Sequence, residues 1–259
     1  DNRAGAGGVI GIDLAAKAMP DGYVMASGNS TNICMNRTAV AKLPYDVDRD
    51  LRAVIQTHFQ PNVLVVSLSL PANSVKELID YARKNPGKLM YSSSGNGSSL
   101  HFAGELFRLM TNIDIGHVPY ASVPVAMNDL FGGRVPMTFS NMSAIAPHIH
   151  AGKVRALAVT SIRRSALMPE LPTIAESGLP GYEIVAWGGL VVPAKTPPAI
   201  VSKLNAAANK ALQAPGMKEK MTTLGLELVG GTPEEFGAFI RREYAKWSDV
   251  AKKIGIKPE

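Results

Sequence analysis

Residues 89–110 read LMYSSSGNGSSLHFAGELFRLM, and this stretch indicates the fold class of the chain. Leu89 to Ser93 is a short apolar run typical of a buried strand, and Ser98 or Ser99 is placed to cap a helix. The face that this helix buries would carry Leu100, Ala103, Leu106, Phe107 and Met110. A strand that leads through a small polar loop into an amphipathic helix is the unit from which α/β folds are built.

The same alternation extends from this stretch in both directions. Upstream, the sequence predicts strands over 23–27 and 63–66, and a helix from a capping box at 74–77 to about Lys84. Downstream, it predicts helix 125–131, strand 135–139, helix 144–151, strand 154–160, helix 199–212 and a helix opened by the capping box at 232–235. This rhythm predicts mostly parallel sheets with helices on both faces.

Composition narrows the class of protein and the class of partner. The chain has 259 residues, 46% of them hydrophobic and 19% charged, which suits a large globular core that commonly splits into two lobes. The net charge is +6, but Lys and Arg are scattered without interleaved aromatic residues, so nucleic acid is not an expected partner. No apolar stretch is long enough to span a membrane. The chain starts at Asp1 with no visible signal peptide, as a processed or cut chain would.

Patterns typical of catalysis are missing from the sequence. A single cysteine, Cys34, excludes an internal disulfide and a cysteine cluster for zinc, and the five histidines lack the spacing of a metal site. The chain has no Gly-x-Ser-x-Gly elbow and no Walker loop, and the glycines of 5–11 do not fit a dinucleotide fingerprint. We therefore expect no catalytic residue, no metal and no cofactor.

Polar loops that directly follow strands are the chemistry that the sequence does offer. Segment 92–101 holds small, uncharged residues at the start of a helix, where free backbone N–H groups favour an anion. The same composition also suits an ordinary helix cap and turn, and both interpretations stay open. Segments 27–32 and 139–143 are similar. Since ligands of open α/β sheets lie beyond the carboxyl ends of strands, these loops are the candidate binding elements.

Motifs along nearly the whole chain carry a family resemblance. They are NRAGAGG (2–8), PDGY (20–23), KLPYD (42–46), PNVLVV (61–66), NPGKL (85–89), GNGSS with His101 (95–101), HVPY (117–120), AGKVRALAVT (151–160), LPTIAESG (171–178) and GGTPE (230–234). In this order they are similar to the Bug (TctC-like) family of tripartite tricarboxylate transporter receptors.

The resemblance implies a two-lobe α/β fold like that of type II periplasmic binding proteins. Lobe one would comprise residues 1–60 and 187–259 and lobe two residues 61–186, with hinge crossings near Gln60 and 185–189. It also implies a monomeric periplasmic receptor that closes on a small carboxylate, either a dicarboxylate or an aromatic acid, and delivers it to a membrane transporter. The expected ligand-binding residues are Asn29, Ser30, Thr31, Ser94, Gly95, Asn96, Gly97, Ser98, Ser99, His101, Tyr120, Ser140, Asn141 and Trp187.

Two departures from the family pattern affect the expected site. The first strand and the Pro-Gly-Gly-type loop that usually precede the NRAGAGG segment are not in this sequence, so part of the cleft would be missing or would lie outside it. Ser140 stands where the family often has Asp, which favours a ligand without an amine at that end.

Two other function classes compete with a receptor. An α/β enzyme acting on a small carboxylic acid is the first alternative, but His101 is the only candidate base in the polar loops and no orienting acid is near it in sequence. A structural or partner-binding module is disfavoured by the many glycine-rich polar loops at strand ends.

Overall fold

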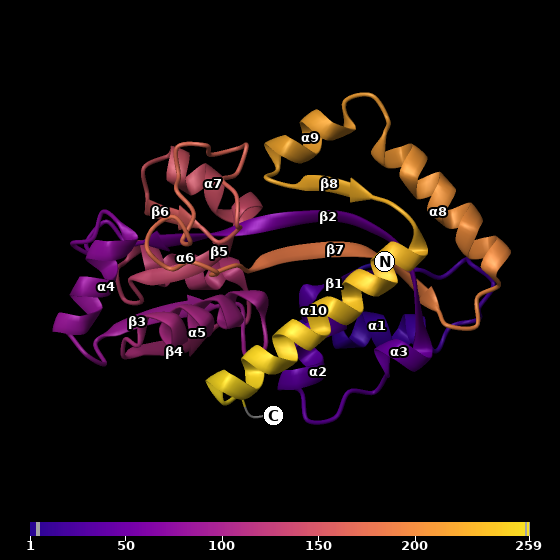
Figure 1. The fold of residues 1–259 in the computed structure, drawn as a ribbon, viewed down its shortest axis with the longest axis horizontal. Helices are drawn as coiled ribbons and strands as arrows, with labels where there is room; N and C mark the ends of the chain where they lie inside the picture. Colours follow the sequence, from indigo (N-terminus) through magenta and orange to yellow (C-terminus); the bar gives the residue numbers. More distant parts are fainter. Residues whose placement is uncertain (4–5, 257, 259) are drawn as a thin grey trace. The chain divides into compact units, whose positions relative to one another are not determined.

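The computed structural model describes residues 1–3, 6–256 and 258, and the chain divides into two compact units (Figure 1). Unit 1 comprises Asp1–Phe59, Trp187–Met221 and Glu227–Glu259. Unit 2 comprises Gln60–Ala186 and Thr222–Leu226. Among the described residues, no helix combines the length and the apolar character needed to cross a membrane.

Unit 1 is built on a four-stranded sheet in the order β1-β7-β2-β8. These strands are β1 (Ala26–Asn29), β7 (Val185–Pro193), β2 (Leu51–Val66) and β8 (Glu227–Gly230). β1 pairs antiparallel with β7, and β8 pairs antiparallel with the first part of β2. β2 and β7 both continue into unit 2, so the two units share two strands of the chain.

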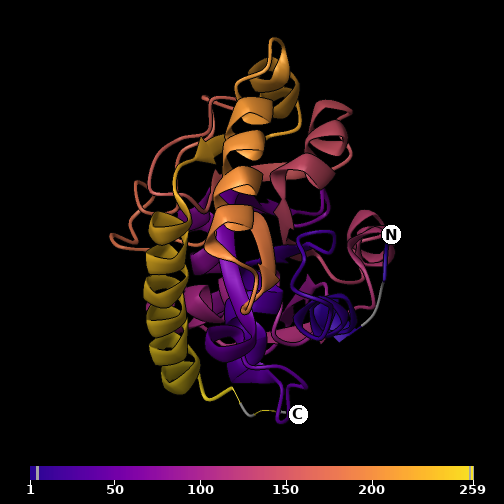
Figure 2. The same ribbon diagram turned by 90° about the vertical axis from the view of Figure 1, so that its right-hand side faces the viewer.

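The helical elements of unit 1 form two hydrophobic clusters on its sheet. The elements are η1 (Ala6–Gly8), α1 (Val9–Ala16), η2 (Ser30–Met35), α2 (Asn36–Ala39), α3 (Val47–Asp50), α8 (Pro198–Leu212), α9 (Met217–Thr223, which runs into unit 2) and α10 (Pro233–Ile254). Ile12, Ile33, Trp187 and Phe236 join α1, η2, β7 and α10 in one core cluster. A second cluster packs α8 on Val54 and its neighbours, and Figure 2 shows α8 next to α10.

Unit 2 has a mixed five-stranded sheet in the order β6-β2-β5-β3-β4. Its strands are the second part of β2 together with β3 (Leu89–Ser93), β4 (Ile115–Pro119), β5 (Met137–Asn141) and β6 (Arg155–Val159). β3 is parallel to β4 and β5, whereas β2 is antiparallel to β5 and β6. The carboxyl ends of β3, β4, β5 and β6 and the Asn62 end of β2 therefore meet at one edge, which we call the binding edge.

Helices cover both faces of the unit 2 sheet. They are α4 (Val75–Lys84), α5 (Ser99–Thr111), α6 (Val123–Phe131) and α7 (Met142–His150). On one face, Phe107 of α5 packs edge-on against Phe139, with ring centroids 5.9 Å apart. Gly104 is required there because a Cβ would come within 2.1 Å of the Tyr91 ring. On the other face, α6 and α7 pack on Val63 and Val65.

Several predicted elements agree with the structure. Strand β3 spans the predicted residues 89–93, and Ser98 is the residue that caps α5. The helix predicted to end near Lys84 ends there, and α10 begins with the predicted capping box of Thr232 and Glu235. These elements carry their start and stop signals locally, so the sequence alone locates them.

Other predictions were wrong in ways that have physical reasons. The predicted α/β class with flanking helices is confirmed, but the sheets are mixed and not mostly parallel, because the long strand β2 runs antiparallel to β5, β6 and β8. The strand predicted over 23–27 is β1 at 26–29, and Tyr23 is 92% exposed. Ser74 caps α4, but the Glu77 carboxylate accepts from Asn73 N–H, so the predicted capping box is incomplete.

The remaining differences are shifts of element ends by one or two residues and one long extension. α6, β5, α7, β6 and α8 are the shifted elements. The strand predicted over 63–66 begins at Leu51, because residues 51–60 pair within unit 1, which the local pattern did not indicate.

Candidate functional site

The loop between β3 and α5 is held by hydrogen bonds to its own backbone. Ser93 Oγ accepts from Gly95 N–H (3.1 Å), and Ser98 Oγ donates to the Gly95 carbonyl (2.8 Å) while accepting from His101 N–H (3.2 Å). Gly95 and Gly97 have φ values of 109° and 74°, which favour glycine. The loop is therefore shaped in advance of any ligand.

Three stacked aromatic side chains pack against this loop. The ring of His117 lies 4.9 Å from that of Tyr91 and 4.1 Å from that of His101, and both pairs are stacked. His101 Nδ1 accepts from Gly97 N–H (3.2 Å), and His117 Nε2 lies 2.7 Å from Ser93 Oγ. Burial, followed by the neighbouring His101, lowers the pKa of His117 to about 3, so this imidazole is neutral at physiological pH.

Tyr91, at one end of the stack, is held by hydrogen bonds in the core of unit 2. Tyr91 Oη donates to Glu105 Oε1 (2.8 Å), and burial, with the charge of Glu105 second, raises the pKa of this phenol. Arg108 pairs with the other oxygen of Glu105 (2.7 Å). His101 and His117 thus belong to a packed network, and the Glu105 carboxylate below them is committed to Tyr91 and Arg108.

Three helices begin at the binding edge, and their first turns carry no acidic residue. These helices are α5, α6 and α7, which follow β3, β4 and β5. Elsewhere, α3, α4, α9 and α10 have Asp or Glu in the first turn, whereas α1, α2 and α8 also lack an acid there. Because first-turn acids neutralise the positive end of a helix, their absence leaves the three N-termini of the binding edge attractive to an anion.

Among the serines of the first loop, Ser98 and Ser99 differ in their availability. The hydroxyl of Ser98 is committed to the helix cap and to Gly95. Ser99 is buried at the first turn of α5, and its hydroxyl makes no hydrogen bond among the described residues. Ser99 is therefore the stronger candidate for a donor to a bound anion.

Ser140 and Asn141 end β5 at the binding edge but face opposite sides of its sheet. Ser140 is 1% exposed and lines a small cavity of about 10 Å³ with Thr138 and Leu100. Asn141 lies in register with Asn62 of β2. Asn62 is 0% exposed, and within the described part of the chain its amide atoms have no hydrogen-bond partner, although its backbone bonds Thr160.

Asn62 is the residue of the binding edge that the sequence reasoning missed. It stands at the start of the apolar run PNVLVV, where an amide in front of four buried hydrophobic residues is an unusual choice. That contrast was a usable signal in the sequence.

Tyr120 follows β4 and turns toward α6. Its hydroxyl donates to Asp129 Oδ2 (2.5 Å), and Arg134 pairs with the other oxygen of the same carboxylate. The pKa of Tyr120 is raised by burial and by this bond, whereas the Tyr120 bond is the main cause of the lowered pKa of Asp129. The hydroxyl of Tyr120 is thus already engaged within unit 2.

The predicted residues of unit 1 are held by local structure. Asn29 caps η2 by accepting from the N–H groups of Thr31 and Asn32, and Asn32 Oδ1 accepts in return from Asn29 N–H. Ser30 is buried in the first turn of η2. Trp187 is 1% exposed in the core of unit 1, and its Nε1 donates to Glu243 (3.2 Å), which gives it a packing role.

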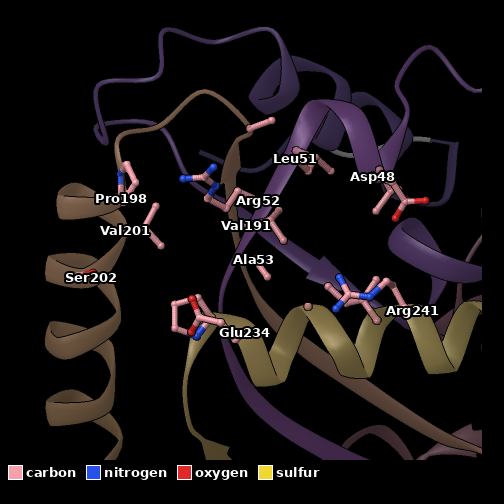
Figure 3. Close-up of a pocket in the computed structure, with 15 residues that line it drawn as sticks. Asp48, Leu51, Arg52, Ala53, Val191, Pro198, Val201, Ser202, Glu234 and Arg241 are labelled. Atoms are coloured by element: carbon pink, nitrogen blue, oxygen red, sulfur yellow. The ribbon is translucent and has the colours of Figure 1, made fainter.

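A larger hollow of about 690 Å³ lies in unit 1 between α8 and α10 (Figure 3). Its lining combines apolar side chains such as Val191 and Val201 with both cations and anions, Arg52, Arg241, Asp48 and Glu234. The predicted binding residues all lie outside this lining. Within the described part of the chain, no group of three or more His, Cys, Asp and Glu side chains is arranged to hold a metal ion.

Comparison with known proteins gives a consistent family assignment. The profile of the tripartite tricarboxylate transporter family receptors matches residues 1–256. A protein encoded in the tcbD-tcbE intergenic region of Pseudomonas sp. (strain P51) is 42% identical over 96% of this chain and 74% of its own length.

Two solved structures extend the comparison to the fold. R. palustris Rpa4515 with adipate is 39% identical, with a TM-score of 0.95 over 100% of this chain and 87% of that chain. The periplasmic binding protein BugD is 30% identical, with a TM-score of 0.90 over 100% of this chain and 87% of that chain.

Proposed function

The chain belongs to the family of tripartite tricarboxylate transporter receptors, and on this premise we propose that it captures a small carboxylate, a dicarboxylate or an aromatic acid, for a membrane transporter of that type. It is a solute-binding receptor and not an enzyme. We propose that it acts in the periplasm, since the related BugD is a periplasmic binding protein. We also propose that it acts as a monomer.

The observation that carries this proposal is the electrostatic character of the binding edge. Three helix N-termini gather there without an acidic residue in their first turns. Strands β3 and β5 and the loop 94–98 contribute amides and hydroxyls but no charged side chain. Neutral donors and helix ends attract a carboxylate without a salt bridge, which suits a receptor that must also release its ligand.

The candidate residues fall into two groups by their contacts. Ser99, Ser94, Asn96 and Asn141 are the proposed direct contacts of unit 2, and Asn29, Ser30 and Thr31 are the candidate contact residues of unit 1. Gly95, Gly97, Ser98, His101, Tyr120, Ser140 and Trp187 shape or support the site through the contacts described above.

The matched pair Ser99→Ala and Ser98→Ala tests the proposal. Isothermal titration with a panel of small carboxylates should give saturable binding to the wild type. Ser99→Ala should weaken binding by about 1–3 kcal/mol with little change in stability, because a free hydroxyl donates to the ligand. Ser98→Ala should cost about 1 kcal/mol of stability, because the helix cap is lost. Equal losses of affinity and stability in both variants, or no binding across the panel, would contradict the proposal.

A further inference from the structure

Buried polar atoms without a hydrogen-bond partner gather at the binding edge. Both amide atoms of Asn62, Oδ1 of Asn141, Oγ of Ser92 and Oγ of Ser140 are of this kind. Buried polar groups in folded proteins are nearly always paired, so unpaired ones that share a face of the sheet call for an external partner.

The two amides lie together, whereas the two hydroxyls lie on the other face of the sheet. Asn62 and Asn141 are directly opposite each other in the antiparallel pairing of β2 and β5, so their side chains share a face about 5 Å apart. Ser140 precedes Asn141 and therefore points to the opposite face, as does Ser92, which is in register with Thr138. We call Asn62 and Asn141 the amide pair.

The hydrogen-bonding capacity of the amide pair indicates what it would bind. A carboxylate only accepts hydrogen bonds, so it can satisfy the Asn62 NH₂ group but neither of the amide oxygens. Those oxygens need an O–H or N–H donor. The strand segments that carry the pair, residues 62–66 and 137–141, and the neighbouring β3 contain no charged side chain, so these strands offer no carboxylate to pair with an ammonium group.

We propose that Asn62 and Asn141 determine ligand specificity by recognising a hydroxyl group on the carbon next to a ligand carboxylate. The Asn62 NH₂ donates to a carboxylate oxygen, and one of the two amide oxygens accepts the single O–H of a hydroxyl on the neighbouring carbon. The preferred ligand class is a hydroxycarboxylate. This inference rests on the proposed function and assigns a chemical class to the ligand of the same site.

Titration with matched acids that differ by one hydroxyl tests the inference. Malate with succinate and citrate with tricarballylate are suitable probes for isothermal titration. The wild type should bind the hydroxy acid of a pair at least about tenfold more tightly than its partner, the discrimination expected from one hydrogen bond to a buried polar group. Asn62→Leu removes both amide atoms at similar volume, and the ratio should fall to about one.

Two controls separate recognition from folding. Ser92→Ala removes an unpaired hydroxyl from the opposite face of the same sheet and should leave the ratio unchanged. Thermal melting of Asn62→Leu should show no loss of stability, because an unpaired buried amide is replaced by an apolar group. If Asn62→Leu does not fold, Asn141→Ala on the less buried partner should lower the ratio instead.

The possible outcomes distinguish the inference from the proposed function. Equal binding of both members of each pair, tighter binding of the plain acids, or an unchanged ratio in Asn62→Leu would overturn the inference while the receptor function stands. Binding of no acid in the wider panel would overturn the proposed function and the inference with it.

Discussion

Acidification is expected to destabilise unit 2 through His117. This imidazole lies between the rings of Tyr91 and His101 and next to Ser93 Oγ, and its pKa is lowered from 6.5 to about 3, mainly by burial. In the unfolded chain the same group takes up a proton near pH 6.5. The unfolded state therefore binds more protons between pH 6.5 and about 3, and stability falls as the pH falls through this window.

The size of the effect follows from the difference between the two pKa values. At pH 5 the unfolded imidazole is protonated and the folded one is not, which amounts to about 2 kcal/mol by proton linkage. His117 is only partly buried, so solvent screening reduces this to about 1 kcal/mol. At pH 7.5 the corresponding loss in the free energy of unfolding is close to zero.

Urea unfolding of the wild type and His117→Gln at pH 7.5 and pH 5 measures this contribution. Glutamine keeps a polar nitrogen near Ser93 but does not titrate, and the other ionisable groups are the same in both proteins. The variant should be less stable at pH 7.5 because the ring stack is lost. That difference should shrink by about 1 kcal/mol at pH 5. If the difference in stability between wild type and variant is the same at both pH values within about 0.3 kcal/mol, the conclusion that His117 is neutral in the folded protein is refuted.

Substitutions at three other positions give separate tests. His101→Asn keeps an acceptor for Gly97 N–H and should retain carboxylate affinity within about threefold, whereas His101→Leu should lose about tenfold, roughly one hydrogen bond, in isothermal titration. Gly104→Ala places a methyl group 2.1 Å from the Tyr91 ring and should lower the free energy of unfolding by about 2–3 kcal/mol in urea titration; unchanged stability would contradict the packing described. Ser140→Asp buries a carboxylate on the face away from the amide pair and should cost about 3 kcal/mol in thermal melting; if it instead changes only the preference between acids with and without an amine, Ser140 faces the ligand.

Local signals explain most of what could be predicted about the fold. Ser98, Thr232 and the β3 run act within a few residues of chain, because caps and short apolar strands depend on local hydrogen bonds and on hydrophobic pattern. The family motifs along the chain pointed to the receptor assignment, which the family profile and the solved relatives confirm.

The pairing of strands that are distant in the chain decided which side chains meet, which the sequence did not indicate. Asn62 and Asn141 are 79 positions apart and meet only because β2 runs antiparallel to β5, and no local pattern encodes that direction. The same holds for Tyr91 and His117, which stack because they lie in register in β3 and β4. The sequence by itself located the starts of α4, α5 and α10 and predicted which polar loops are candidates for binding an anion. Only the tertiary structure decided which of these side chains are already committed to one another and which are left unpaired, because burial and hydrogen-bond partners depend on segments that are distant in the chain.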